Sequence, residues 1–290
     1  MISLIPIITF TITILFALIT VCINIRILYN TFITKIYKRC SSFTLFYVRF
    51  GVDSFIAAIN VILITFPFMR LLQPSKNFDS FQTFIFWVVW PDSLILSVRT
   101  ILAIIITLDR LVAVFFPIAH HNNRARVSNT VIVLIPISYT LVENIILWGF
   151  CNFRFGFAPG CLTFGCILGD CFMDYAMNFE LLAHVIAALT TLLLVTKLYI
   201  FNNCKSNDKQ VKNKEMERAN FLALLDTFII VFFDILPSFL ITKFPVLGSG
   251  GIGLYAFSRL GGFALEGYLA QRSLKRKNET VVARSSLVVA

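Results

Sequence analysis

Seven apolar stretches, separated by short polar connections, run through the chain. A helix needs about 20 consecutive apolar residues to cross the hydrocarbon of a bilayer. Stretches of about that length occur at residues 5–28, 43–68, 84–108, 130–150, 175–201, 221–244 and 250–269. The pattern predicts an all-α membrane protein, a seven-transmembrane helix bundle that occupies residues 1–272. A short basic tail at 273–290 follows, and we expect it to be disordered.

The composition supports lipid rather than water as the solvent of this bundle. Hydrophobic residues make up 58% of the chain and charged residues only 14%, whereas about 25% are charged in ordinary soluble domains. A soluble fold could not bury so much apolar surface, but lipid can contact it directly. The net charge of +10 would suggest a nucleic-acid partner for a soluble protein. Here the basic residues lie between the apolar stretches, so we expect membrane lipids and no nucleic acid as their partners.

The basic residues also set the expected orientation. With the N-terminus outside, most of the 25 Lys and Arg residues fall on the inner side of the membrane. The outer connections then hold only Arg70, Lys76, Arg154 and Lys243. Because cytoplasmic connections carry an excess of Lys and Arg, this distribution predicts an outside N-terminus and a cytoplasmic C-terminus.

One outer connection, residues 151–174, is rich in cysteine. Its four cysteines are Cys151, Cys161, Cys166 and Cys171. Disulfides persist outside the cell, so all four are disulfide candidates, and the sequence leaves three possible pairings open. No His lies near them at the spacing of a metal site, and the chain has no His-Glu-x-x-His motif. We therefore expect no metal, no cofactor and no enzyme activity.

An acid–base pair directly follows the third span. Asp109 and Arg110 come after about 25 mostly apolar residues, and Ala113 and Pro117 follow them. The arginine cannot be neutralised by losing its proton, whereas the aspartate can be neutralised by gaining one. A charge pair that merely ends a helix is the simpler interpretation. The spacing to Pro117 and the basic connection at 202–220 favour a functional site at the inner face instead.

The connection after Pro117 contains further basic side chains: His120, His121, Arg124 and Arg126. We expect these to form a solvated or lipid-facing inner loop. His184, in the fifth span, is interpreted as a packed or hydrogen-bonded residue rather than a ligand-binding one.

Ionisable side chains inside the spans form a second set of candidates. Each costs roughly 2.5–3.5 kcal/mol on insertion, so we expect them to face the bundle interior and to pair with one another. Arg49 and Asp53, four residues apart, lie on one helix face and can neutralise each other. The expected interior polar network comprises Asn24, Arg49, Asp53, Arg99, Asp234 and Glu266.

Four residues in the outer half of the bundle are candidates for lining a ligand pocket. They are Trp87, Trp90, Asp92 and Arg259. Structural pairing is an equal alternative for the two charged residues, and the two tryptophans can equally be anchors at the membrane interface.

The seven spans, the outside N-terminus and the Asp-Arg pair together resemble a G-protein-coupled receptor. Asp109, Arg110, Ala113 and Pro117 have the spacing of the rhodopsin-like pattern D-R-x-x-A-x-x-x-P. The resemblance implies that these residues couple the protein to a heterotrimeric G protein. It also implies that Glu217, at the inner end of the sixth span, faces Arg110.

Other features depart from the rhodopsin-like pattern. Ile235 stands where a tryptophan is usual two residues before Pro237, and the third span begins without a cysteine to bridge the outer loop. These departures, with the outer-loop pattern from Pro159 to Tyr175, resemble the nematode serpentine chemoreceptors of the Srbc kind. The resemblance implies an outer loop that disulfides staple to itself. It further implies a multi-pass receptor for a small environmental molecule in the plasma membrane of sensory-neuron cilia.

An ion channel or a secondary transporter is the alternative function, because charged residues inside the spans would offer a permeation path. Against this alternative, the chain has no inverted repeat. No feature of the sequence predicts the oligomeric state or the identity of the ligand.

Overall fold

A computed structural model gives the fold and describes residues 4–37, 43–73, 79–124, 127–157, 161, 164–204, 214–237, 240 and 251–288. Helices form all the regular secondary structure of these residues, and no strand occurs among them. The elements are α1 (Leu4–Phe32), α2 (Thr44–Leu72), η2 (Asp79–Phe81), α3 (Gln82–Phe115), α4 (Pro117–Arg124), α5 (Asn129–Asn144), η3 (Ile145–Phe150), α6 (Phe164–Leu168), α7 (Asp170–Cys204), α8 (Lys214–Ile229), η4 (Ile230–Ile235) and α11 (Gly251–Val288). η2 is a 3-10 helix, whereas η3 and η4 are π-helices that continue α5 and α8.

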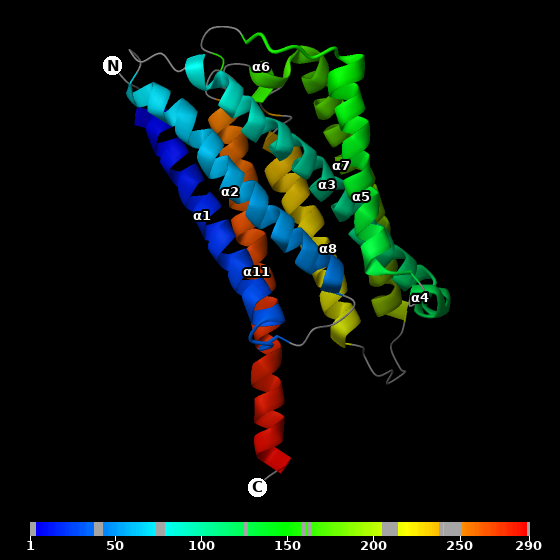
Figure 1. The fold of residues 1–290 in the computed structure, drawn as a ribbon. Helices are drawn as coiled ribbons and strands as arrows, with labels where there is room; N and C mark the ends of the chain where they lie inside the picture. The colour runs from blue at the N-terminus through cyan, green and yellow to red at the C-terminus, as the bar shows by residue number, and fades with distance from the viewer. Residues whose placement is uncertain are drawn as a thin grey trace.

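Seven long helical segments form an antiparallel bundle within the described part of the chain (Figure 1). α1, α3, α7 and α11 run from the end that carries α6 to the end that carries α4, and α2, α5 and α8 run in the opposite direction. α1 packs against α2 and α11, while α3 packs against α2, α5 and α7. This architecture confirms the predicted all-α bundle. The two ends are referred to below as the α6 end and the α4 end.

Four of the described helices are long and apolar enough to cross a membrane by length and composition alone: Pro6–Phe32, Thr44–Leu72, Asn129–Phe150 and Asp170–Lys197. The remaining predicted spans fall on α3, α8 with η4, and α11, which carry charged side chains between their apolar ones. Residues 238–239 and 241–244 of the sixth predicted span, and residue 250 of the seventh, lie outside the described residues. The charge-bearing segments therefore depend on the neighbouring helices to shield their charges from lipid.

Large apolar side chains cover much of the outer surface of the bundle. Leu141 on α5 is 66% exposed, and Leu189 and Leu192 on α7 are 57% and 62% exposed. A soluble protein rarely leaves such a surface open to water. The exposed leucines fit a bundle whose outer surface faces lipid.

Several helices extend beyond the predicted spans at the α4 end. α3 continues past Leu108 to Phe115, so the Asp-Arg pair lies inside the helix rather than after its end. Pro117 begins α4, a position at which the missing N–H and fixed φ of proline are compatible with a helix. α8 begins at Lys214, within the connection that the sequence left without structure.

The tail differs from the sequence-based expectation of disorder. α11 continues through it to Val288 and extends from the α4 end of the bundle (Figure 1). Residues 268–288 contain neither Gly nor Pro, so the sequence supplies no stop signal for the helix that crosses the bundle.

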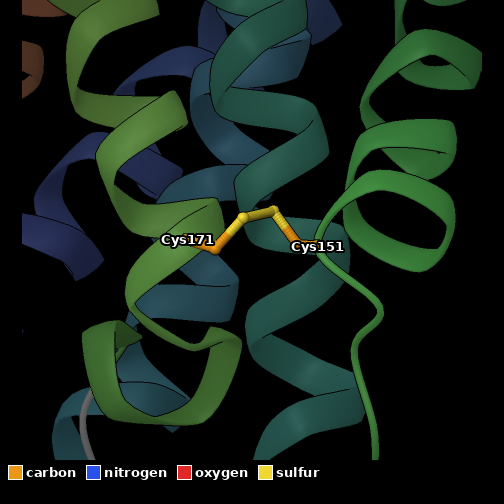
Figure 2. Close-up of a disulfide and its surroundings, with 2 residues drawn as sticks. All are labelled: Cys151 and Cys171. Carbon is orange, nitrogen blue, oxygen red and sulfur yellow. A yellow bond between two sulfur atoms is a disulfide. The ribbon is translucent and has the colours of Figure 1, made fainter.

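Two disulfides close the connection at the α6 end. Cys151, which directly follows η3, is bonded to Cys171 at the start of α7 (Figure 2), and Cys161 is bonded to Cys166 in α6. Gly169 lies between α6 and α7 with φ of 81°, which glycine adopts without the strain that a side chain would cause. Of the three possible pairings, the structure has Cys151–Cys171 with Cys161–Cys166, so both disulfides close the loop on itself.

Candidate functional site

Seven charged side chains from five helical elements meet inside the bundle. This charge cluster consists of Arg49 and Asp53 on α2, Arg99 on α3, Glu180 on α7, Asp234 in η4, and Arg259 and Glu266 on α11. Its three guanidinium groups face four carboxylates. Charges buried away from water need such partners, since an uncompensated one costs several kcal/mol.

Arg99 lies at the centre of the charge cluster and is only 2% exposed. Its Nε donates to Asp53 Oδ1 at 2.7 Å. Its Nη1 lies 3.8 Å from Asp234 Oδ2, and its Nη2 lies 3.7 Å from Glu266 Oε2. The guanidinium carbon is also 4.0 Å from the ring centroid of Phe263, which adds a cation–π contact. One side chain of α3 therefore contacts acids from α2, η4 and α11.

Arg49 forms the part of the charge cluster between α2 and α11. It is fully buried, and its Nη2 donates to Glu266 Oε2 at 3.0 Å. Its Nε lies 3.9 Å from Asp53 Oδ2, the neighbour expected from the four-residue spacing on one helix face. The two residues of α2 are thus neighbours, but each has a closer partner on another helix: Glu266 for Arg49 and Arg99 for Asp53.

Arg259 forms the part of the charge cluster nearest the start of α11. Its Nε donates to Asp234 Oδ1 at 3.0 Å, and its Nη2 donates to Glu180 Oε1 and to the hydroxyl of Tyr255. The Tyr255 hydroxyl in turn donates to Glu180 Oε1 at 3.2 Å. Asp234 thus contacts both Arg259 and Arg99, which connects this part to the centre of the cluster.

The predicted interior residue Asn24 lies at a different contact, between α1 and α11. It is 1% exposed, and a Cβ built on Gly267 would lie 2.7 Å from its Oδ1. The absence of a side chain at Gly267 therefore allows α11 to approach α1 closely. Another buried acid, Glu143 on α5, accepts a hydrogen bond of 2.5 Å from Ser97 on α3.

The four candidate ligand-lining residues have different surroundings. Asp92 is 3% exposed and accepts a hydrogen bond of 3.2 Å from Asn60 on α2, while Arg259 belongs to the charge cluster. The rings of Trp87 and Trp90 lie 5.5 Å apart. Trp87 is 51% exposed, a geometry typical of an anchor at the membrane interface.

Both tryptophans belong to a group of packed aromatic rings at the α6 end. This aromatic cluster consists of Phe86, Trp87 and Trp90 on α3, Trp148 in η3, and Phe153, Phe155 and Phe157 in the following loop. Phe86 is fully buried and stacks on Phe153 at 4.8 Å. The indole Nε1 of Trp90 is buried without a hydrogen-bond partner in the described part of the chain.

At the α4 end, Asp109 receives hydrogen bonds from both sides. Arg110, the next residue of α3, donates to its Oδ2. From α4, Arg124 Nε donates to its Oδ1 at 2.9 Å, and His120 Nε2 lies 3.2 Å from the same oxygen. Ala113, one turn further along α3, is 2% exposed.

This geometry corrects the expectation of a solvated or lipid-facing loop after the third span. The segment is helix α4, in which His120 and Arg124 are one turn apart and both contact Asp109. The side chains of His121 and Arg126 lie outside the described residues. Glu217 belongs to α8, but its side chain also lies outside the described residues, so its expected pairing with Arg110 stays a prediction.

Sequence reasoning did not identify three residues of these sites: Glu180, Tyr255 and Arg124. The signal for Glu180 was an acid within an otherwise apolar span. For Arg124 the signal was its spacing of four from His120 after a proline that can begin a helix.

A known protein family matches most of the chain. The family described as serpentine type 7TM GPCR chemoreceptor Srbc matches residues 2–278. No curated protein matches the chain. The family match covers the whole helical bundle, including the charge cluster and the Asp-Arg pair. The chain therefore belongs to the Srbc family of serpentine seven-transmembrane chemoreceptors.

Proposed function

We propose that the protein binds a small environmental molecule in the outer half of the bundle and activates a heterotrimeric G protein at the α4 end. Membership of the Srbc family supports the role of a chemosensory receptor in a membrane. The Lys and Arg distribution supports an orientation in which the α6 end faces outward and the α4 end faces the cytoplasm. The plasma membrane of sensory cilia is the proposed location.

The observation that carries the proposal is the state of Arg110. The residue is only 5% exposed, and Asp109 on the same helix accepts a hydrogen bond from its guanidinium group. Its Nε has no hydrogen-bond partner among the described residues. A buried guanidinium whose acidic partner among the described side chains is Asp109 is a group that a conformational change can release toward a partner.

The outer part of the proposed ligand site combines an aromatic surface with a few polar groups. The buried indole N–H of Trp90, which has no partner among the described residues, can donate to a hydrogen-bond acceptor on a ligand. Asp92 and Arg259 supply buried polar groups. Apolar lining with few polar groups is the usual chemistry of small-molecule sites.

The charge cluster supports a route from the ligand to the α4 end. Asp234 in η4 contacts Arg259 and Arg99, so a ligand that competes for Arg259 changes the forces on the sixth span. Outward movement of α8 with η4 would open a cleft beside Arg110. A ligand that binds the outward arrangement more tightly than the resting one then shifts the population toward the outward arrangement.

Replacement of Arg110 by Ala tests the proposal. Cells that carry a calcium or cyclic-nucleotide reporter express the wild type or the variant, and volatile and soluble odorants are screened on both. We expect Arg110→Ala to abolish the agonist response while surface expression stays at the wild-type level. A normal response from the well-expressed variant would contradict the proposed coupling.

The intramembrane charges that suggested an ion channel or secondary transporter form ion pairs with one another in the charge cluster. No observation on the described residues therefore favours that function over the receptor. Ion flux through liposomes that contain the purified protein alone would reverse this preference.

A further inference from the structure

We propose that Arg124 is a positioning residue of the activation site, a second cation for Asp109 that sets how readily Arg110 is released. The proposal rests on the proposed function, in which free Arg110 engages the G protein. It adds a residue that lies outside the Asp-Arg motif and on a different helix.

The two oxygens of Asp109 have separate partners. Oδ2 accepts from Arg110, and Oδ1 accepts from Arg124 Nε at 2.9 Å with His120 Nε2 at 3.2 Å. The side chains of Asp109, Arg110 and Arg124 are 11%, 7% and 22% exposed. One carboxylate is therefore shared between two largely buried guanidinium groups, one from α3 and one from α4.

Arg124 is fixed by contacts that do not involve α3. Its Nη1 donates to the carbonyl oxygen of Val127 at 3.0 Å, and its Nη2 donates to the side-chain oxygen of Asn129 at the start of α5. The guanidinium forms hydrogen bonds in three directions, which suits its planar, forked shape. Because two of these contacts are independent of Asp109, Arg124 remains in place when Arg110 leaves.

This arrangement lowers the cost of activation. When Arg110 leaves, the carboxylate of Asp109 stays in a largely buried site. Removing the partner of a buried charge is strongly unfavourable unless another group compensates it. Arg124 supplies that compensation with a full charge, whereas His120 supplies one only if protonated. Without Arg124, Asp109 holds Arg110 more tightly and the active arrangement becomes rarer.

The experiment uses the full chain in lipid nanodiscs with Arg124→Gln, and it needs no known agonist. One readout is agonist-independent uptake of GTPγS by purified heterotrimers of the different Gα classes. The other is the distance between spin labels at Ile25→Cys and Phe221→Cys, in a background whose free cysteines are replaced. Both positions are exposed, at 53% and 49%, and they report on α8 relative to α1.

We expect Arg124→Gln to lower both the uptake and the fraction of outward α8 by roughly three- to tenfold, as for a partly exposed charge-assisted hydrogen bond. Arg124→Lys restores most of both, because it keeps the charge beside Asp109. In an Asp109→Asn background, Arg124→Gln has no further effect, since a neutral side chain needs no second cation. Arg272→Gln is the matched control. It removes the same charge from an exposed position on α11, and both readouts stay unchanged.

Three results would overturn the proposal. One is an outward fraction in Arg124→Gln that equals or exceeds the wild-type value. Another is an equal loss in the Asp109→Asn background, which would make Arg124 a purely structural link between α4 and α5. The third, decisive even if Arg124→Gln does not fold, is loss of the outward arrangement in well-folded Arg124→Lys. If neither the wild type nor any variant stimulates a heterotrimer without agonist, the label distances alone decide the role of Arg124. The proposed function is then decided separately, by the agonist response of the wild type and of Arg110→Ala.

Discussion

Replacement of Arg99 by methionine tests whether the charge cluster holds the bundle together. Methionine keeps a long side chain but removes the charge. The change deletes the 2.7 Å hydrogen bond to Asp53 and the contact with the Phe263 ring. Four carboxylates of the cluster then face the two guanidinium groups of Arg49 and Arg259.

The expected loss follows from the burial and the distances. Removing one partner of a buried ion pair costs about 3–5 kcal/mol. We expect the lower value, about 3 kcal/mol, because only the contact with Asp53 is of hydrogen-bond length, and those with Asp234 and Glu266 are 3.8 and 3.7 Å. At about 2–4 °C for each kcal/mol in a chain of this size, Tm falls by about 6–12 °C.

Thermal unfolding of the purified receptor in detergent, followed by the fluorescence of its three tryptophans, measures this change. Arg272→Met, at an exposed position of α11, is the matched control and leaves Tm unchanged. Adding Asp53→Asn to Arg99→Met recovers part of the loss, because the neutral amide no longer needs a cation. A Tm for Arg99→Met within about 2 °C of the wild type would refute the reasoning, since the ion pairs would then contribute little.

Two further changes test the packing and the outer loop. Gly267→Ala brings a Cβ to 2.7 Å from Asn24 Oδ1 and should cost about 1–3 kcal/mol, measured as a lower Tm, whereas Gly156→Ala has open space and should leave Tm unchanged. Equal Tm values for the two variants would show that α1 and α11 are not tightly packed. Replacing Cys151 and Cys171 by Ser opens a link between residues 20 positions apart and should remove about 3 kcal/mol of stability. Unfolding of the wild type with and without reductant opens the Cys161–Cys166 disulfide as well, and identical curves would contradict a stabilising disulfide.

The fold was largely predictable because its main signal is local. Apolar stretches of membrane length locate the helices, and the four-residue spacing of Arg49 and Asp53 places them on one face. The positions at which the helices end were less predictable. The thickness of the lipid sets the length of the apolar stretch, but a helix can continue beyond the membrane. α3 and α11 therefore continue past the apolar stretch where no Gly or Pro stops them.

Contacts between helices were not predictable from one sequence. The charge of Arg99 required some acid as a partner, but several acids in the spans satisfied that requirement equally. Only the bundle determines that Asp53 is the closest and that Asp234 is shared with Arg259. Arg124 was taken for a loop residue because its partner, Asp109, lies 15 positions earlier in the chain and on another helix.

The charge cluster also affects how the protein is made. Arg49 and Asp53 leave the ribosome together on α2, and Arg99 follows into a membrane that already holds its acid. Glu180 and Asp234 come next, while Arg259 and Glu266 arrive only with the last helix. A nascent chain therefore carries uncompensated charge in the bilayer until translation is nearly finished. A product truncated before α11 keeps that unpaired charge, by which cellular quality control can recognise it.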